Sequence, residues 1–343
     1  MKVGYIAPAS ISVVNGGVRT QSNMTIEQIK NFGVEPILIS PWENLNIREL
    51  DLIHVFGATV ENAGILPQIV NQGIPVVLSP VFYSNRSANL INKYIRIEKL
   101  LSFIGSGIRS DLGIKKELCD MADLILPNTK QESDLIKQGF GIPHSKINVI
   151  PNGVEDRFNE ADKTLFVDKY RIEDFVLFVG QASAERKNVI SLLKAAPKLN
   201  SKVVIVGSFD QSEYSQKCLA LAKNTNNILL IDSLSHNSDL LSSAYAAAKV
   251  FVLPSYFETP GIAALEAGLA GANIAITEVG GTKEFFTNHA FYLDPKSESS
   301  IVDAINSALS KDVNSDLKVH ILENYTWNKV AQKTLDQYKG LLK

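Results

Sequence analysis

The sequence predicts an α/β protein with two Rossmann-like, doubly wound domains that face a central cleft. Three observations lead to this fold class. The chain has 343 residues, which is more than one hydrophobic core usually organises. Short apolar runs that end in Gly, Pro, Ser or Asn alternate with helix-length segments, as in βαβ units. The series of apolar runs then starts again near residue 175.

Each half of the chain supplies a set of these runs. In the first half we expect strands at residues 3–7, 36–39, 52–56, 76–78, 124–126 and 148–150. In the second half we expect them at residues 175–179, 202–206, 228–231, 250–253, 273–276 and 291–293. Parallel strands that are covered by helices on both faces bury such apolar runs completely. Between the two sets, residues 151–153 (PNG) form a turn signal, so the first domain is expected to close there.

The composition is that of an ordinary globular protein. About 45% of the residues are apolar and 20% are charged, with a formal net charge of −2. A charge this close to neutral argues against nucleic-acid binding. The first apolar run is too short for a signal-peptide core, and no apolar run approaches the roughly 18 residues of a membrane span. We therefore expect a cytoplasmic location.

The segment richest in candidate chemistry follows the predicted strand at residues 250–253. We expect Thr259 to cap a helix whose first residue is Pro260, a position that tolerates proline. The free amides of Gly261, Ile262 and Ala263, together with the helix dipole, then offer a binding site for a diphosphate.

Glu258 and Glu266 flank this helix start and can accept hydrogen bonds from ligand hydroxyls. The alternative is that Glu258 only complements the helix dipole and that Glu266 is a solvated helix residue.

Residues 253–268 (LPSYFETPGIAALEAG) resemble the E-x7-E signature of retaining glycosyltransferases with the GT-B fold, the glycosyl transferases group 1. Further segments agree in order along the chain: residues 121–128 (MADLILPN), 149–154 (VIPNGV), 235–240 (SHNSDL) and 326–327 (TW). The resemblance implies three parts. Residues 1–152 are an acceptor-side domain, residues 153–322 bind the nucleotide sugar, and residues 323–343 are a helix that returns to the first domain.

The resemblance also implies roles for the residues of the second domain. Glu258 holds hydroxyls of the transferred sugar, and Glu266 holds the ribose of the nucleotide. The family clamps the diphosphate with a lysine and an arginine that follow the strand at residues 175–179. Lys187 matches the lysine, but Gln181 stands where the arginine is usual, so we expect Arg186 to compensate. The alternative is a solvated Arg-Lys pair.

In the first domain, Gly16 and Gly17 resemble the family's glycine loop, which approaches the diphosphate of the donor. Arg19 is a candidate for binding phosphate or acceptor. His54, at the end of a predicted strand, is a candidate on the acceptor side, although a lone histidine there is more often structural. Many relatives place a histidine after the next strand, whereas residues 79–83 contain none. No D-x-D motif is present, so we expect neither a metal nor another cofactor.

We interpret the chain as a retaining, metal-independent glycosyltransferase. It would move a sugar from a nucleoside-diphosphate donor to a hydroxyl of a saccharide or lipid-linked acceptor, as in cell-surface polysaccharide synthesis. The alternatives are a nucleotide-sugar epimerase or hydrolase on the same fold, and a non-catalytic scaffold that binds sugar nucleotides. Residues 94–116 mix apolar and basic side chains, which is typical of contact with an anionic membrane but equally of a helix with a solvated basic face.

Overall fold

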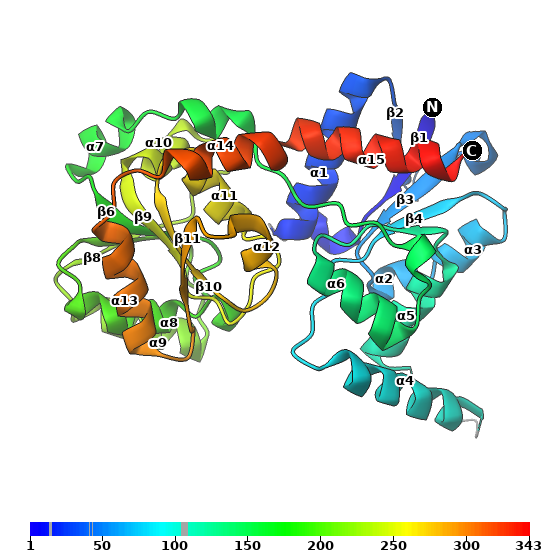
Figure 1. The fold of residues 1–343 in the computed structure, drawn as a ribbon, viewed down its shortest axis with the longest axis horizontal. Helices are drawn as coiled ribbons and strands as arrows, with labels where there is room; N and C mark the ends of the chain where they lie inside the picture. The colour runs from blue at the N-terminus through cyan, green and yellow to red at the C-terminus, as the bar shows by residue number, and fades with distance from the viewer. Residues whose placement is uncertain (14–15, 41, 43, 104–108) are drawn as a thin grey trace. The chain divides into compact units, whose positions relative to one another are not determined.

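The computed structural model describes residues 1–13, 16–40, 42, 44–103 and 109–343. The chain forms two compact units, shown in Figure 1. Unit 1 comprises Met1–Gly153 together with Trp327–Lys343, and unit 2 comprises Val154–Thr326. Within the segment 94–116 discussed above, residues 104–108 lie outside the described part.

Unit 1 is built on a five-stranded, entirely parallel sheet of order β2-β1-β3-β4-β5. Its strands are β1 (Lys2–Ile6), β2 (Glu35–Leu38), β3 (Leu52–Phe56), β4 (Val76–Ser79) and β5 (Leu124–Ile125). The strand predicted at residues 148–150 is wrong, because only an isolated bridge between Ile125 and Ile147 forms there. Ile150 donates its amide to the Pro127 carbonyl, but Pro127 has no N–H with which to continue the ladder.

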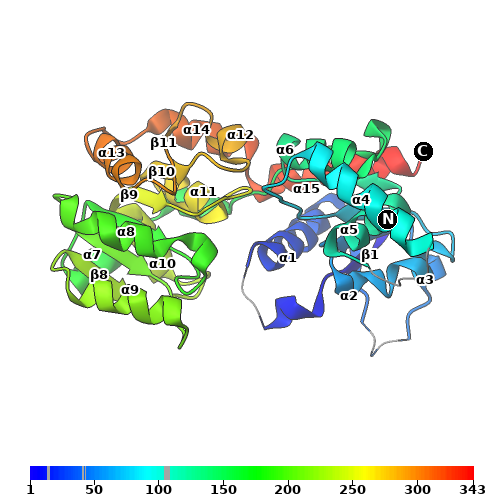
Figure 2. The ribbon, with the colours of Figure 1, turned by 90° about the horizontal axis from the view of Figure 1, so that it is seen from below.

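Helices cover both faces of this sheet. On one face, α1 (Gly17–Ile29) packs against α15 (Trp327–Leu341), so the last helix of the chain completes the first unit. The remaining helices of unit 1 are α2 (Val60–Ala63), α3 (Leu66–Val70), α4 (Ala88–Phe103), α5 (Asp111–Met121) and α6 (Lys130–Asp134). Helix α5 contacts α2, α3 and α4, and Figure 2 shows α4 beside α5 and α6.

Unit 2 is built on a six-stranded parallel sheet of order β11-β10-β9-β6-β7-β8. Its strands are β6 (Phe175–Val179), β7 (Val203–Val206), β8 (Ile228–Ile231), β9 (Ala248–Leu253), β10 (Asn273–Thr277) and β11 (Ala290–Leu293). Counted within the unit, this is the 3-2-1-4-5-6 order of a doubly wound Rossmann sheet. The predicted fold class of two Rossmann-like α/β domains is confirmed.

Two groups of helices cover the faces of this second sheet (Figure 1). One group contains α8 (Val189–Ala195), α9 (Glu213–Lys223) and α13 (Glu298–Leu309), which contact one another through α8. The other contains α7 (Thr164–Tyr170), α10 (Asp239–Ala247), α11 (Ile262–Leu269) and α14 (Ser315–Asn324). The short helix α12 (Thr282–Phe286) follows β10. No helix among the described residues is long and apolar enough to span a bilayer.

Strands β6 and β9 mark the point where the strand order of unit 2 reverses. They lie side by side, with Val176 opposite Val250 and Leu177 opposite Phe251. The segments that follow two such strands run to opposite faces of the sheet and leave a crevice at the carboxyl ends of the strands. The sites predicted around Lys187 and Glu258 follow β6 and β9 respectively, so they lie at this switch point.

The chain leaves unit 1 and returns to it at one tightly packed position. Gly153 is the last residue of the first stretch and Trp327 begins the second. A Cβ atom at Gly153 would lie 2.8 Å from both the backbone nitrogen and the Cδ2 atom of Trp327. Only glycine therefore fits at this position without displacing the start of α15.

We predict that Gly153→Ala destabilises unit 1, because the added methyl group overpacks the first residue of α15. Overpacking of this kind costs about 1–3 kcal/mol. Gly340→Ala, within α15, is a matched control, since an added Cβ there meets no described atom within 4 Å. It should leave the stability unchanged or raise it by up to about 1 kcal/mol. Chemical denaturation followed by circular dichroism measures both effects, and equal behaviour of the two variants would contradict the prediction.

Candidate functional site

The backbone of Glu258 is fixed just beyond the end of β9. Its amide donates to the Val279 carbonyl at 3.1 Å, and its carbonyl accepts from the Gly281 amide at 2.9 Å. Gly280 lies opposite Glu258 in an isolated parallel bridge and has a φ of +100°. A Cβ atom at Gly280 would lie 2.0 Å from the Glu258 carbonyl oxygen, so the close approach requires glycine. The segment after β10 thus holds Glu258 just beyond the carboxyl end of β9.

The Glu258 carboxylate is buried, with a residue exposure of 5%, and three donors converge on one of its oxygens. Oε1 accepts from the Lys187 ammonium at 2.7 Å and from the Ser255 hydroxyl at 2.6 Å. The Arg186 guanidinium approaches the same atom at 3.5 Å. The structure therefore brings three predicted catalytic residues together, and the alternative of a solvated Arg-Lys pair is wrong.

The second oxygen of Glu258 has no hydrogen-bond partner within the described ranges. Burial raises the pKa of Glu258, but the charges of Lys187 and Arg186 and the hydrogen bonds from Lys187 and Ser255 lower it more. The net pKa lies below its usual value, so the group is ionised at neutral pH. The arrangement leaves Oε2 able to accept a hydrogen bond from a ligand hydroxyl.

Asn188 positions Lys187, and the sequence analysis did not identify it. This fully buried residue adopts a left-handed backbone conformation with a φ of +54°. Its side-chain nitrogen, Nδ2, donates to the carbonyls of Pro254 at 2.9 Å and Pro295 at 2.8 Å. Its side-chain oxygen, Oδ1, accepts from the Ser191 hydroxyl. One side chain thereby ties the segment after β6 to the ends of β9 and β11. Asparagine tolerates left-handed conformations, which is a weak sequence signal for such a position.

Arg186 is held mainly through backbone contacts to the segment after β9. Its Nη1 atom donates to the Phe257 carbonyl at 2.9 Å, and its guanidinium lies 5.0 Å from the centre of the Phe257 ring. Its own carbonyl accepts from the Tyr256 amide at 2.9 Å. The Arg186 side chain remains 39% exposed, whereas that of Lys187 is only 15% exposed. Lys187 is therefore the more desolvated cation of the two.

Helix α11 begins later than predicted. The expected cap at Thr259 and first residue at Pro260 are wrong, because the helix starts at Ile262 and Gly261 is its N-cap. Gly261 has a φ of +67°, and this left-handed turn delays the helix until after the Pro-Gly pair. The Gly261 carbonyl accepts the first helical bond, whereas no bond uses the amides of Gly261, Ile262 or Ala263 in the described part of the chain. The predicted free amides are present at the corrected helix start.

Glu266 is not a solvated helix residue, so that alternative is wrong. It lies in the second turn of α11 with 4% exposure. Oε1 is 2.8 Å from Nε2 of His236, and Oε2 accepts from the Tyr245 hydroxyl at 2.7 Å. Burial, followed by the nearby Glu266 carboxylate, raises the pKa of Tyr245 well above its usual value. The sequence analysis missed both partners of Glu266, because they come from a loop after β8 and from α10.

The predicted residues of unit 1 have different surroundings. Gly16 is the exposed N-cap of α1 and Gly17 is the first residue of that helix. An added Cβ would meet no described atom within 4 Å at either position, so packing against the described residues of unit 1 does not require these glycines. Arg19 lies half-buried in the first turn of α1.

His54 lies in the core of unit 1, in agreement with the structural alternative given for this residue. It is 1% exposed and stacks on Phe56 with 4.2 Å between ring centroids. Nδ1 is 2.6 Å from the Tyr338 hydroxyl, and Nε2 is 2.9 Å from the Ser79 hydroxyl. The Tyr338 hydroxyl also lies 3.4 Å from that of Tyr5. This buried chain of hydrogen bonds joins α15 to strands β1, β3 and β4.

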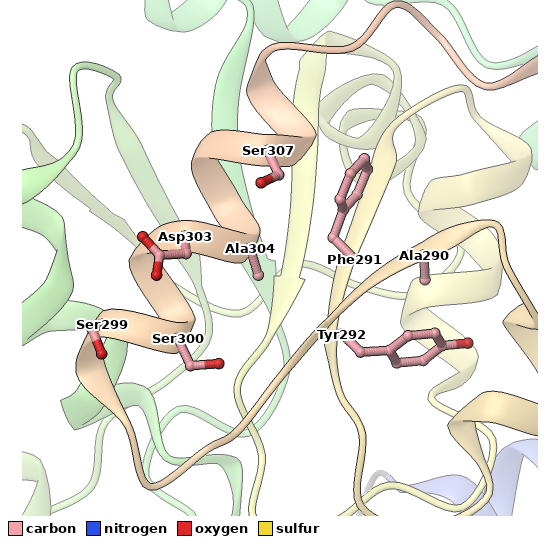
Figure 3. A pocket seen from close by; sticks show the side chains of 8 residues that line it. All are labelled: Ala290, Phe291, Tyr292, Ser299, Ser300, Asp303, Ala304 and Ser307. Carbon is pink, nitrogen blue, oxygen red and sulfur yellow. The ribbon is translucent and has the colours of Figure 1, made fainter.

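Two pockets lie away from the residues predicted to bind the donor or the acceptor, and the second of them is lined in part by the segment 94–116. One pocket of about 510 Å³ lies between β11 and α13, where Figure 3 shows Tyr292 and Phe291 on the strand and Ser300 and Asp303 on the helix. Another, of about 550 Å³, lies in unit 1 beside α4. The candidate site is therefore defined by the polar groups at the switch point between β6 and β9 and not by either of these pockets.

We predict that acid destabilises unit 1 through His54. Burial lowers the pKa of His54 to about 3, whereas the ordinary value is 6.5. Between these two values, His54 therefore binds a proton in the unfolded chain but not in the folded chain. Stability attributable to His54 is complete above pH 6.5 and is lost progressively as the pH falls from 6.5 towards about 3. The loss is about 1.4 kcal/mol per pH unit in this range.

Denaturant titrations between these pH values measure the effect. His54→Asn should be less stable at neutral pH but should show a shallower dependence of stability on pH. His144→Asn, which replaces an exposed histidine of unit 1, is the control and should keep the wild-type slope. A wild-type slope in His54→Asn would show that other groups cause the acid sensitivity.

Comparisons with known proteins place this geometry in context. Residues 162–325 match the family model of the glycosyl transferases group 1, which covers most of unit 2. An uncharacterised glycosyltransferase of Methanocaldococcus jannaschii is 29% identical over 219 residues, which are 58% of this chain and 55% of the relative. The chain spans about half the length of the first curated relatives that it matches.

Solved structures resemble the chain over its whole length. Sucrose-phosphate synthase from Thermosynechococcus elongatus superposes with a TM-score of 0.77 at 16% identity, covering 99% of this chain and 98% of the other. Anabaena HepE in complex with UDP-glucose superposes with a TM-score of 0.73 at 15% identity, covering 99% and 100%. The chain therefore has the fold of the GT-B glycosyltransferases, and its second unit carries the match to the glycosyl transferases group 1.

Proposed function

We propose that the protein is a glycosyltransferase that moves a sugar from a nucleoside-diphosphate donor to a hydroxyl of an acceptor. The observation that carries this proposal is the arrangement at the switch point of unit 2. An ionised, buried carboxylate with one free oxygen lies beside two cations and a helix start with unused amides. These groups complement the two halves of a sugar nucleotide, namely sugar hydroxyls and a diphosphate. The family match of unit 2 supports the same function.

Glu258 is the proposed partner of the transferred sugar. Its free Oε2 accepts hydrogen bonds from hydroxyl groups, while Lys187 and Ser255 keep Oε1 in place. Because the cations hold the pKa of Glu258 low, the carboxylate stays an acceptor throughout the physiological range. It is a positioning group for the sugar and not a proton donor.

The diphosphate is the proposed ligand of the helix start. The amides of Gly261, Ile262 and Ala263 and the dipole of α11 favour an anion at this position. Lys187 uses one of its three N–H groups on Glu258 and can direct the others to a phosphate. The leaving nucleoside diphosphate gains negative charge as the glycosidic bond breaks, so these fixed donors lower the barrier.

Glu266 is the proposed partner of the ribose hydroxyls.

We infer that the reaction retains the anomeric configuration and does not need a metal. The Glu258 carboxylate is engaged by Lys187 and Ser255, which suits a binding role better than that of a nucleophile. The acceptor hydroxyl would then attack on the face from which the diphosphate leaves, with a phosphate oxygen taking its proton. Lys187, Arg186 and the α11 amides supply positive charge of the kind that a metal provides in other enzymes.

The acceptor is proposed to be a saccharide or lipid-linked saccharide, as in the synthesis of cell-surface polysaccharides. Gly16 and Gly17 leave the start of α1 open to close approach by a ligand, and Arg19 follows in the same turn. Packing against the described residues explains neither glycine, which supports a ligand-related reason for the absent side chains.

The exposed side chains of helix α4 support the proposal that the protein contacts an anionic membrane. Four apolar side chains follow one another at helical spacing and are each more than 40% exposed: Leu90, Tyr94, Ile97 and Leu101. Leu100 is 66% exposed beside this row, and the exposed residues Lys93 and Arg96 flank it. An apolar row bordered by cations is typical of helices that lie in a membrane interface. A lipid-linked acceptor would make such a contact useful.

We predict that Glu258→Gln and Lys187→Met lower the rate of sugar transfer by at least about 100-fold, because each removes a charge that holds the sugar or the leaving diphosphate. Lys198→Met is the control, since it removes a cation of a surface ion pair with Glu298 in the same unit. Transfer from UDP-, GDP- and ADP-sugars to saccharide acceptors is followed by mass spectrometry, and NMR of the product reports the anomeric configuration. Thermal unfolding checks that each variant is folded.

The outcomes separate the proposal from its alternatives. Retained configuration and full activity in EDTA are the expected results. Consumption of the donor without a new glycosidic product would indicate an epimerase or hydrolase. Binding of nucleotide sugars without any turnover, unchanged in the variants, would indicate a scaffold. Absence of stabilisation by every nucleotide sugar would contradict the proposed function as a whole.

We predict that the protein co-sediments with vesicles that contain anionic lipid at low salt. Each basic residue near such a surface contributes about 1 kcal/mol, so binding should weaken as salt screens the charges. Ile97→Glu places a negative charge in the apolar row and should abolish the binding. Leu165→Glu alters a comparably exposed apolar residue of α7 and should leave it intact. Binding to neutral but not to anionic vesicles would contradict a contact made by α4. Equal loss of vesicle binding in both variants would also contradict it.

A further inference from the structure

Both oxygens of Glu266 are already occupied by protein donors. His236 takes Oε1 at 2.8 Å and Tyr245 takes Oε2 at 2.7 Å. A carboxylate can accept about four hydrogen bonds, but Glu266 is only 4% exposed. If Glu266 binds ribose hydroxyls, as proposed above, we therefore infer that one of its two covering partners moves aside to let the ribose reach the carboxylate. Which of the two partners is displaced determines how nucleotide binding depends on pH.

Tyr245 cannot yield without disrupting the core. It is 1% exposed and makes edge-on ring contacts with Phe158 at 5.5 Å and with Phe251 at 5.8 Å. The side chain of His236, in contrast, is 40% exposed and lies on the loop after β8. The imidazole is therefore the partner that can move.

The surroundings of His236 allow its ring to turn while its backbone stays fixed. Arg157 donates to the His236 carbonyl at 2.5 Å, which anchors the main chain. On the far side of the ring, Nδ1 lies 3.8 Å from Oε1 of Glu155 and 3.3 Å from the Asn237 side-chain oxygen. The other oxygen of Glu155 is bound by Arg157 at 2.7 Å. The imidazole thus stands between two carboxylates, and Glu155 remains available when Glu266 is taken.

We propose that His236 competes with the ribose of the sugar nucleotide for Oε1 of Glu266, so that nucleotide binding displaces the imidazole and is weakened by its protonation. The proposal rests on the proposed function, because it takes Glu266 as the ribose partner. His236 is a positioning residue here and does not touch the reacting atoms. No covalent step is involved, and the exchange replaces one hydrogen bond to the carboxylate by another.

The charges around His236 set the direction of the pH effect. The hydrogen bond to Glu266 raises the pKa of His236, burial opposes this, and the charges of Glu266 and Glu155 support it while that of Arg157 opposes it. Below the raised pKa, a protonated imidazole holds Glu266 through a charge-assisted bond. Above it, the bond is between a neutral ring and a carboxylate and is weaker. Nucleotide affinity should therefore rise as the pH increases through the pKa of His236.

Calorimetric titration tests the inference with UDP, GDP and ADP at about pH 6 and about pH 8.5, which bracket the titration of a histidine. The wild-type protein should bind the accepted nucleotide about fivefold more tightly at the higher pH, the difference expected between a charged and a neutral hydrogen bond. The 2′,3′-dideoxy analogue has the same phosphates and so the same phosphate titration, but it lacks the competing hydroxyls. It should not show the His236-dependent part of the pH effect.

Two substitutions complete the test. His236→Ala should bind the intact nucleotide more tightly than the wild type at about pH 6 and should lose the His236-dependent part of the pH effect. His289→Ala alters another histidine of unit 2, one that stacks near His320, and should behave as the wild type. Thermal unfolding of both variants reports whether unit 2 remains folded.

The unfavourable outcomes are distinct. Weaker binding by His236→Ala at both pH values would mean that the histidine only supports Glu266, which overturns the competition. An equal pH effect in the wild type and in His236→Ala would also overturn it, while leaving the proposed function intact. Failure of the wild-type protein to bind any of the three nucleotides would overturn both.

Discussion

The candidate site depends on one buried ion pair, between Glu258 and Lys187. A carboxylate with so little exposure is costly to keep ionised unless a cation and further donors compensate for the lost water. Lys187 and Ser255 supply that compensation at a single oxygen. The consequence is an asymmetric carboxylate, with one oxygen bound by three donors and the other without a partner among the described residues. A solvated glutamate would have neither the fixed position nor the free oxygen.

The pair forms only because the topology of unit 2 brings distant segments together. Lys187 follows β6 and Glu258 follows β9, two strands that are neighbours in the sheet although about 70 residues separate the loops. Asn188 then ties the first loop to the ends of β9 and β11, and Gly280 admits the backbone of Glu258. The geometry is therefore imposed by backbone contacts, and the charged side chains occupy positions that these contacts have already set.

The sequence predicts most of the strands well because they depend on local apolar patterns, and it places the candidate site after the strand that ends at residue 253. It also predicts which residues carry charge near that point. It fails where a single backbone conformation or a distant partner decides the outcome. The left-handed Gly261 moves the start of α11 past the Pro-Gly pair. His54 ends a predicted strand, where a polar group can face a ligand, but the hydroxyl of Tyr338 that bonds it lies 284 residues later in the chain.

The two units share a doubly wound architecture but place different chemistry near the carboxyl ends of their strands. In unit 1, His54 has both nitrogens satisfied, and the start of α1 carries the exposed glycines Gly16 and Gly17. In unit 2, the corresponding region concentrates charge, free amides and a carboxylate oxygen without a partner. Fixed charges can favour one ligand strongly, because they are already desolvated and oriented before it arrives. The described groups at the strand ends of unit 2 therefore suit a charged ligand, whereas the start of α1 in unit 1 presents exposed backbone.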